Sequence, residues 1–136
     1  MDVAVEGRIR IPYRWPAGRA GGMFLSLLAS EGRFVGSRCA PCRRVAVPPT
    51  SRCCRCHVEC AETVPVGPEG TIVTWTSSPA GLFALIRLDG ADSALLHRIV
   101  EASEVRTGMR VAAVFEKERK GSILDVAGFR PTGGVR

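Results

Sequence analysis

The chain of 136 residues has little of what most enzymes and membrane proteins need. It holds two histidines and 6% aromatic residues, with no glycine-rich phosphate-binding fingerprint, no carboxylate pair of telling spacing, and no internal repeat or low-complexity tract. No apolar run approaches the roughly 18 residues of a membrane span, and no basic segment leads into an apolar one at the N-terminus. These absences argue against a membrane or secreted protein, and we expect the chain to be cytoplasmic.

The composition is that of an ordinary soluble globular protein. Apolar residues make up 46% and charged residues 24% of the sequence, and the length suits one domain or two very small ones. In a reducing compartment, six cysteines are not expected to form a disulfide framework. Metal-ligating or catalytic roles for these cysteines therefore gain weight.

The positive charge lies in the first half of the chain. Residues 1–60 hold ten arginines and four acidic residues, whereas residues 61–136 hold nine basic and nine acidic residues. Seventeen of the nineteen basic residues are arginine, whose planar fork suits phosphate or carboxylate. The first half is either a solvated basic face or an anion-binding surface.

Two Cys-x-x-Cys pairs face each other across a ten-residue loop that contains Pro48 and Pro49. We expect two short strands in that loop, with the prolines at the turn between them. Two such pairs provide four thiolates, the ligand set of a closed zinc-ribbon site, and four protein ligands favour a structural over a catalytic ion. The predicted metal ligands are Cys39, Cys42, Cys53 and Cys56.

The ligand register has alternatives. Cys54 and His57 also have knuckle spacing, and Cys60 follows closely. We favour the pair that begins at Cys53 because it mirrors the first pair, and interpret Cys54 and Cys60 as small, partly buried thiols. His57 with Cys60 as a base and nucleophile is a weaker alternative. Five arginines flank the pairs and are placed to offset the charge of the site: Arg38, Arg43, Arg44, Arg52 and Arg55.

Apolar residues at helical spacing precede the cysteine pairs. They are Met23, Phe24, Leu27 and Leu28, with flexible glycines before them and Gly32 after them. This pattern predicts an amphipathic helix of about two turns. A helix this short needs support, so its apolar face should pack on the ribbon, on the C-terminal module or on another chain.

An extended arm rich in arginine precedes the helix. Tyr13 and Trp15 lie in it, bracketed by prolines. Aromatic and arginine residues in an arm are common interface anchors. Packing of the arm onto the protein's own body is the alternative.

The C-terminal half reads as five strands separated by turn residues. The predicted strands span residues 70–78, 82–89, 93–100, 109–118 and 122–129. The link 101–108 has room for one helical turn, which completes the pattern of an OB-fold barrel. Trp75 is expected to fill the barrel, and His97 to be a half-buried strand histidine with its hydrogen bonds satisfied.

The order of these segments resembles the acyl-CoA-associated family of rubredoxin-like zinc-ribbon plus OB-fold proteins. The resemblance rests on YRWPAG, FLSLL, GSRCAPCRRVAVPPTSRCCRC, EGTIVTWT, RTGMRVAAVFE and GFRP, and covers nearly the whole chain. It implies a mainly β fold in three parts: arm and helix in residues 1–34, zinc ribbon in 35–66, and a five-stranded OB-fold in 67–136. The family often has glycine after each Cys-x-x-Cys, where this chain has Arg43 and His57, and arginine after the prolines, where it has Thr50.

The resemblance also implies a function. Members are small, non-catalytic partners of thiolase-type enzymes, including benzoylsuccinyl-CoA thiolase small subunits and steroid side-chain aldolase partners. A large subunit then supplies catalysis, and the pair, expected as a heterotetramer with one structural zinc per small subunit, binds the CoA thioester jointly. Such complexes serve β-oxidation-like degradation. The scarcity of histidine agrees with a chain that lacks thiolysis machinery of its own.

Two other functions compete with this interpretation. A nucleic-acid-binding module would fit the two predicted folds and the pI of about 9.4, but the predicted strands hold few aromatic residues for base stacking. A rubredoxin-like electron carrier would use the same four cysteines to hold iron. The attached barrel and the ten-residue gap favour zinc.

Overall fold

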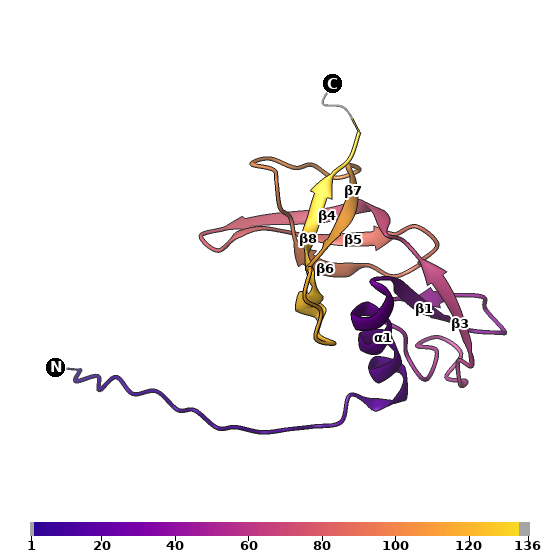
Figure 1. Ribbon diagram of the computed structural model, residues 1–136, viewed down its shortest axis with the longest axis horizontal. Coiled ribbons are helices and arrows are strands. Elements are labelled where there is room, and N and C mark those ends of the chain that lie inside the picture. Colours follow the sequence, from indigo (N-terminus) through magenta and orange to yellow (C-terminus); the bar gives the residue numbers. More distant parts are fainter. Residues whose placement is uncertain (1, 134–136) are drawn as a thin grey trace.

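A computed structural model describes residues 2–133 of the chain. It is mainly β, as predicted, with one helix, a three-stranded sheet and a five-stranded sheet (Figure 1). The elements are α1 (Gly18–Glu31), β1 (Phe34–Arg38), β2 (Val45–Ala46), β3 (Glu62–Val66), β4 (Glu69–Ser78), β5 (Gly81–Leu88), β6 (Leu95–Arg98), β7 (Arg110–Phe115), the 3-10 helix η1 (Ile123–Asp125) and β8 (Val126–Pro131).

The three-stranded sheet carries the cysteine pairs and is here called the ribbon. Its order is β2-β1-β3, with β1 antiparallel to both neighbours. The loop between the two cysteine pairs holds only one strand, β2, and one bridge residue, Arg52, so the prediction of two strands there was wrong. Backbone pairing goes instead to β1, which precedes the first pair.

The five-stranded sheet closes into a barrel. Its order is β6-β5-β4-β7-β8, and β6 meets β8 through a parallel bridge between Ile99 and Phe129, with the Val100 N–H donating to the Phe129 oxygen at 2.8 Å. Gly128 permits this approach, because a Cβ there would lie 2.5 Å from Val100. This closure of strands one, two, three, five and four is the OB-fold topology that the sequence predicts.

The helical turn of the barrel lies elsewhere than expected. Residues 101–108 contain no helical turn, so that prediction was wrong. The one helical turn between the described barrel strands is η1, just before β8. A capping box nucleates it, in which the Ser122 hydroxyl accepts from the Leu124 N–H at 3.2 Å and Asp125 reciprocates. The polar start of the segment therefore became a turn and shortened the strand.

Helix α1 is longer than expected, with 14 residues rather than about two turns. The glycines predicted to precede it lie inside it. Burial of Phe24 and Leu28 supports the helix despite the cost of roughly 1 kcal/mol for each interior glycine. At its C-terminus Gly32 takes the left-handed conformation, and the Arg119 Nε donates to the Ala29 oxygen at 3.0 Å, which places a cation at the negative end.

One hydrophobic core joins the helix, the ribbon and the barrel. Phe34 of β1 lies at its centre, with ring centroids 6.3 Å from Phe24, 5.5 Å from Phe115 and 6.1 Å from Phe129. The helix thus packs on the body of its own chain. The division into parts after residues 34 and 66 stays a prediction, and its outermost residues, 1 and 134–136, lie outside the described range.

The loop between β5 and β6 of the barrel also binds the free edge of the ribbon. The Val45 N–H donates to Asp92 Oδ2 at 2.8 Å, and the Val47 N–H donates to Ser93 Oγ at 2.7 Å. The Asp92 N–H returns a bond to the Val45 oxygen at 2.9 Å. Together with the pairing to β1, these bonds fix the short strand β2.

Trp75 does not fill the barrel, which corrects the expectation from sequence. A register shift between Ile72 and Thr74 interrupts β4, and the strand continues as a hairpin that extends beyond the barrel (Figure 1). Every residue from 73 to 80 is exposed, and Trp75 is 44% exposed. Ile72, just before the shift, is the last buried residue of the strand.

Candidate metal centre

Two knuckle loops present the cysteine pairs. The first knuckle, residues 39–44, follows β1. The Cys39 N–H donates to the Arg44 oxygen at 2.9 Å, and the Arg43 N–H donates to the Cys39 oxygen at 2.8 Å. Arg43 adopts φ of 63°, a left-handed conformation that turns the chain back into β2.

The second knuckle, residues 53–58, repeats this pattern fourteen positions later. The Cys53 N–H donates to the Val58 oxygen at 2.9 Å, and the His57 N–H donates to the Cys53 oxygen at 3.0 Å, with φ of 57° at His57. Arg43 and His57, the two positions at which the family that the sequence resembles often has glycine, are thus both left-handed in this chain. The two knuckles therefore have the same backbone pattern as each other, although their side chains differ.

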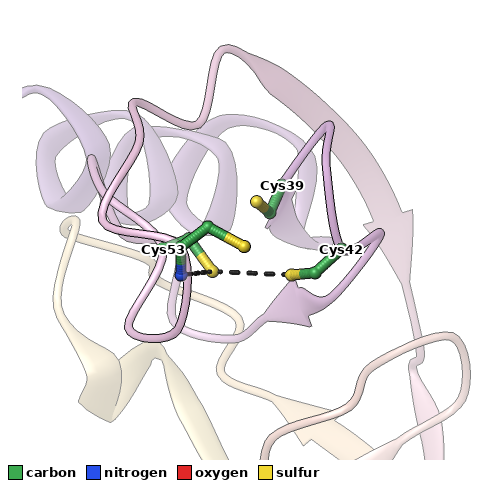
Figure 2. Close-up of side chains that lie close together, drawn as sticks. Cys39, Cys42 and Cys53 are labelled. Atoms are coloured by element: carbon green, nitrogen blue, oxygen red, sulfur yellow. Dashed lines mark hydrogen bonds between the residues drawn. The ribbon is translucent and has the colours of Figure 1, made fainter.

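The two knuckles bring four sulfur atoms together. Figure 2 shows Cys39 and Cys42 pointing from their loop toward Cys53. All four Sγ atoms lie within 4.8 Å of one another, and those of Cys42 and Cys53 are 3.6 Å apart. A tetrahedron with Zn–S bonds of about 2.3 Å has sulfur–sulfur edges of about 3.8 Å, so the spacing suits one metal ion. We call Cys39, Cys42, Cys53 and Cys56 the cysteine cluster.

Backbone N–H groups of the second knuckle point at sulfur. The N–H groups of Arg55 and Cys56 each lie 3.4 Å from Cys53 Sγ. The Cys56 N–H, followed by that of Arg55, lowers the pKa of Cys53 to about 6. Such bonds stabilise a thiolate, the form that ligates a metal.

Cys39 behaves in the opposite way. The Cys42 N–H lowers its pKa, but burial and hydrogen bonds with the other three thiols outweigh this and raise it to about 12. Four crowded thiols thus cannot all ionise without a nearby cation. A divalent ion would supply that charge, and with four protein donors it would have no open position.

The alternative ligand register is not what the structure brings together. In the described residues the cysteine cluster is the one group of its kind. Cys54 and His57 are exposed outside it, so the expectation of a partly buried thiol was wrong for Cys54. Cys60 is half-buried, as expected. Burial raises the pKa of Cys60, which argues against an activated nucleophile at this thiol.

The arginines around the cluster do more than offset charge. The Arg52 guanidinium donates to the His57 oxygen at 2.8 Å and so ties down the second knuckle. Arg38 pairs with Glu62 at 2.8 Å across β1 and β3. Sequence spacing predicted a charge role for both residues, but nothing in the spacing identified these two bonds.

His97 is a half-buried strand histidine, as predicted. Its Nε2 lies 3.3 Å from the Ile123 oxygen, its Nδ1 accepts from the Arg98 N–H at 2.8 Å, and its ring meets Phe129 edge-on. Both nitrogens are thus engaged with backbone. Neither ring nitrogen is therefore placed as a catalytic base would be.

Among residues 2–133, no helix combines the length and the apolar character that crossing a membrane requires.

Comparison with known proteins gives likeness in structure only. No family model matches the chain, and no curated protein matches it. A chain of a structure titled "Ltp2-ChsH2(DUF35) aldolase" is similar over 86% of this chain and 98% of that chain, with 23% identity and a TM-score of 0.60. A DUF35-family protein of unknown function from Sulfolobus solfataricus is similar over 84% of each chain, with 23% identity and a TM-score of 0.64. The chain therefore has the fold of these two DUF35 structures.

Proposed function

We propose that the chain is the small, non-catalytic, zinc-binding subunit of a thiolase-type enzyme that acts on CoA thioesters. The reaction of the complex is thiolysis of a β-ketoacyl-CoA, or retro-aldol or Claisen cleavage of a carbon–carbon bond. The likeness to the chain from an aldolase complex carries this proposal, because it extends over 98% of that chain. The family resemblance of the sequence supports it independently.

A single zinc ion in the cysteine cluster is the first part of the proposal. The spacing of the sulfurs, the N–H groups aimed at Cys53 and the burial of Cys39 and Cys53 all suit a structural ion. Four thiolates also hold iron, as in a rubredoxin-like electron carrier. Metal analysis and colour separate the two, because zinc-loaded protein is colourless and iron-loaded protein is red.

The large subunit supplies the chemistry in this proposal. Thiolysis needs an activated cysteine and a base. In the described residues, Cys60 is the partly buried thiol outside the cluster, and its pKa is raised. The ring nitrogens of His97 are hydrogen-bonded to the backbone. The small subunit then stabilises the large one and completes its acyl-CoA site, in a heterotetramer.

The basic first half is where this chain would meet CoA. Coenzyme A carries several phosphate charges, which arginine binds through paired hydrogen bonds. Arg43 and Arg55 of the knuckles are exposed. These residues are available to a ligand held jointly with a partner.

The surface of the barrel does not support the alternative function of nucleic-acid binding. Readers of single strands need a row of exposed aromatic rings in a basic groove. Of the barrel strands' aromatic residues, Phe129 is buried, Phe115 belongs to the core, and Arg98 covers Phe83 at 5.4 Å. Trp75 is left as the one strongly exposed ring of the described barrel.

A tagged pull-down from native extract at moderate salt tests the proposal. Proteins that co-elute in stoichiometric amount are identified by mass spectrometry, and the metal content of the purified chain is measured. A thiolase-type protein together with about one zinc per chain is the expected result. Nucleic acid in place of protein, or no stoichiometric partner at all, would overturn it.

A further inference from the structure

The arm, residues 2–17, lies outside the folded body of the chain (Figure 1). Residues 2–17 form no helix or strand and run away from α1 into solvent (Figure 1). Six large apolar side chains of the arm are 68–91% exposed: Val3, Val5, Ile9, Ile11, Tyr13 and Trp15. A soluble chain rarely exposes so many apolar residues in sequence unless something covers them.

Apolar residues of the arm alternate strictly with others. Every odd position from 3 to 15 is apolar or is Gly7, whereas the even positions carry charge, alanine or proline. A period of two places one set on one face of an extended strand. The rings of Tyr13 and Trp15 follow this rule, because they stack on the same side with centroids 4.8 Å apart.

The prolines of the arm fall on even positions only, at Pro12 and Pro16. In a β-strand, the amides of alternate residues point to opposite edges, and proline has no N–H to donate. The edge formed by the odd residues therefore keeps every donor, whereas the even edge is interrupted. Such a strand can add to a sheet through one edge and resists addition of a further strand on the other.

We propose that the arm adds as an edge strand to a β-sheet of the thiolase-type large subunit. This inference rests on the proposed function. The odd-numbered amides of residues 3–15 pair with an exposed strand of the large subunit, and the odd side chains cover an apolar surface beside it. The even face carries Arg8, Arg10 and Arg14 against Asp2 and Glu6, so the partner's edge is flanked by acidic groups.

A protein sheet fits these features better than other surfaces. A membrane surface would bind the apolar face but would not distinguish odd from even amides, so the placement of the prolines would be without effect. Two arms from two copies would form only a two-stranded ribbon, which is marginal in water. Strand addition to an existing sheet supplies main-chain bonds and side-chain pockets together.

The test uses the full chain and the large subunit recovered with it, mixed after separate purification. Deletion of residues 2–16 should weaken binding at least about a hundredfold, because six apolar anchors are lost. Gly7→Pro removes one odd donor and no side chain, and should weaken binding about tenfold. The matched control Ala4→Pro removes an even donor and should stay within about twofold of the unaltered chain.

Hydrogen exchange of the complex, resolved to single amides, reads the pairing directly. Protection in the arm should alternate, with the odd residues between Val5 and Tyr13 slow and the even residues fast. Arg8→Pro compared with Arg8→Ala gives a second even-position control at the centre of the arm. Both should bind alike, because their difference lies in a donor on the free edge.

The outcomes separate this inference from the proposed function. Failure of the unaltered chain to bind any thiolase-type protein would remove the proposed function. A complex that tolerates the deletion would leave that function standing and overturn the arm inference. Equal losses in Gly7→Pro and Ala4→Pro, arm-dependent dimers of the isolated chain, or arm-dependent binding to vesicles in place of the large subunit would each overturn it as well.

Discussion

The ribbon and the barrel are both built of short strands, but different forces hold them. Between residues 39 and 61 the ribbon has one strand of two residues and one isolated bridge, and its buried residues other than cysteine are Val45, Val47 and Pro49. The barrel has five paired strands around side chains that are 0–1% exposed: Ile72, Ala84, Ile86, Leu88, Val111, Val126 and Phe129. Burial of apolar side chains can stabilise the barrel by itself, whereas the knuckles need a cross-link between them.

This difference explains why the cysteines lie where they do. The cysteine cluster joins the two knuckles at the point where strand pairing and apolar burial run out. Small modules that cannot build a core commonly rely on a metal or on disulfides. Phe34 then connects the cross-linked part to the buried part, because it packs on the helix and on the barrel at once.

Removing a cluster ligand should break the ribbon and spare the barrel, with the largest effect of any single change. Structural zinc contributes roughly 10–16 kcal/mol to folding of such sites. We expect Cys53→Ser to lose the metal and partner binding, and Cys39→Ser to do the same. Metal content, partner affinity and hydrogen exchange measure this, with faster exchange in residues 39–61 and little change in the barrel strands.

Cys54→Ser is the matched control for this experiment. Cys54 neighbours Cys53 but is exposed and lies outside the cluster. The variant should keep its metal and its partner. A Cys53→Ser protein that retained both would show that the ligand assignment is wrong.

The joint between the two parts should be the next most sensitive position. Phe34 is 1% exposed and contacts three other aromatic rings. We expect Phe34→Ala to lower the free energy of unfolding of the barrel by about 3–5 kcal/mol, measured in urea, because its cavity opens in the core that the barrel shares with the ribbon. The control Leu124→Ala, at a residue 73% exposed, should stay within about 0.5 kcal/mol. An unchanged barrel transition in Phe34→Ala would mean that the two parts fold independently.

Acid should weaken the barrel through Asp125, with a smaller effect. The N–H groups of Lys120, Gly121 and Ser122 bond its carboxylate and hold its pKa below the usual value. A depressed pKa stabilises the fold above the unfolded-state pKa of about 3.9, and this stabilisation is lost as pH falls through the folded-state value.

Comparison with Asp125→Asn isolates this carboxylate. Acid also protonates the cluster thiolates, but that change is common to both proteins and cancels in their difference. The free energy of unfolding of the unaltered chain should exceed that of the variant at pH 7, by an amount that shrinks below about pH 4. An unchanging difference down to pH 2 would exclude the titration of Asp125 as the cause.

The sequence correctly predicted those elements of the structure that depend on local residue patterns. Alternation and turn residues placed all five barrel strands, and spacing placed the cysteine pairs. The start of α1 was missed because glycines that look flexible are stabilised by the distant packing of Phe24 and Leu28. Trp75 was misplaced because the register shift at Ile72 is a tertiary feature, and the pattern of one strand does not reveal where its sheet ends.

The two knuckles allow the same comparison on a finer scale. Each has the same two backbone bonds and the same left-handed residue, but at Arg43 and His57 the chain carries side chains that disfavour this conformation. Left-handed backbone costs roughly 1–2 kcal/mol for a residue other than glycine. The backbone hydrogen bonds of each knuckle are therefore formed against the local preference of these two residues.

Glycine at these positions should relieve the strain, and this is the smallest effect we predict. We expect Arg43→Gly and His57→Gly each to raise the stability of the metal-loaded protein by about 1 kcal/mol, measured by urea unfolding. Arg44→Gly is the control, because Arg44 has no positive φ and glycine there should only add freedom to the unfolded chain and destabilise. Loss of stability in His57→Gly would mean that its side chain makes a contact worth more than the strain. If both substitutions raise the stability equally, the two knuckles are equivalent in energy as well as in hydrogen bonding. This would hold although the first knuckle leads into a strand and the second into an isolated bridge.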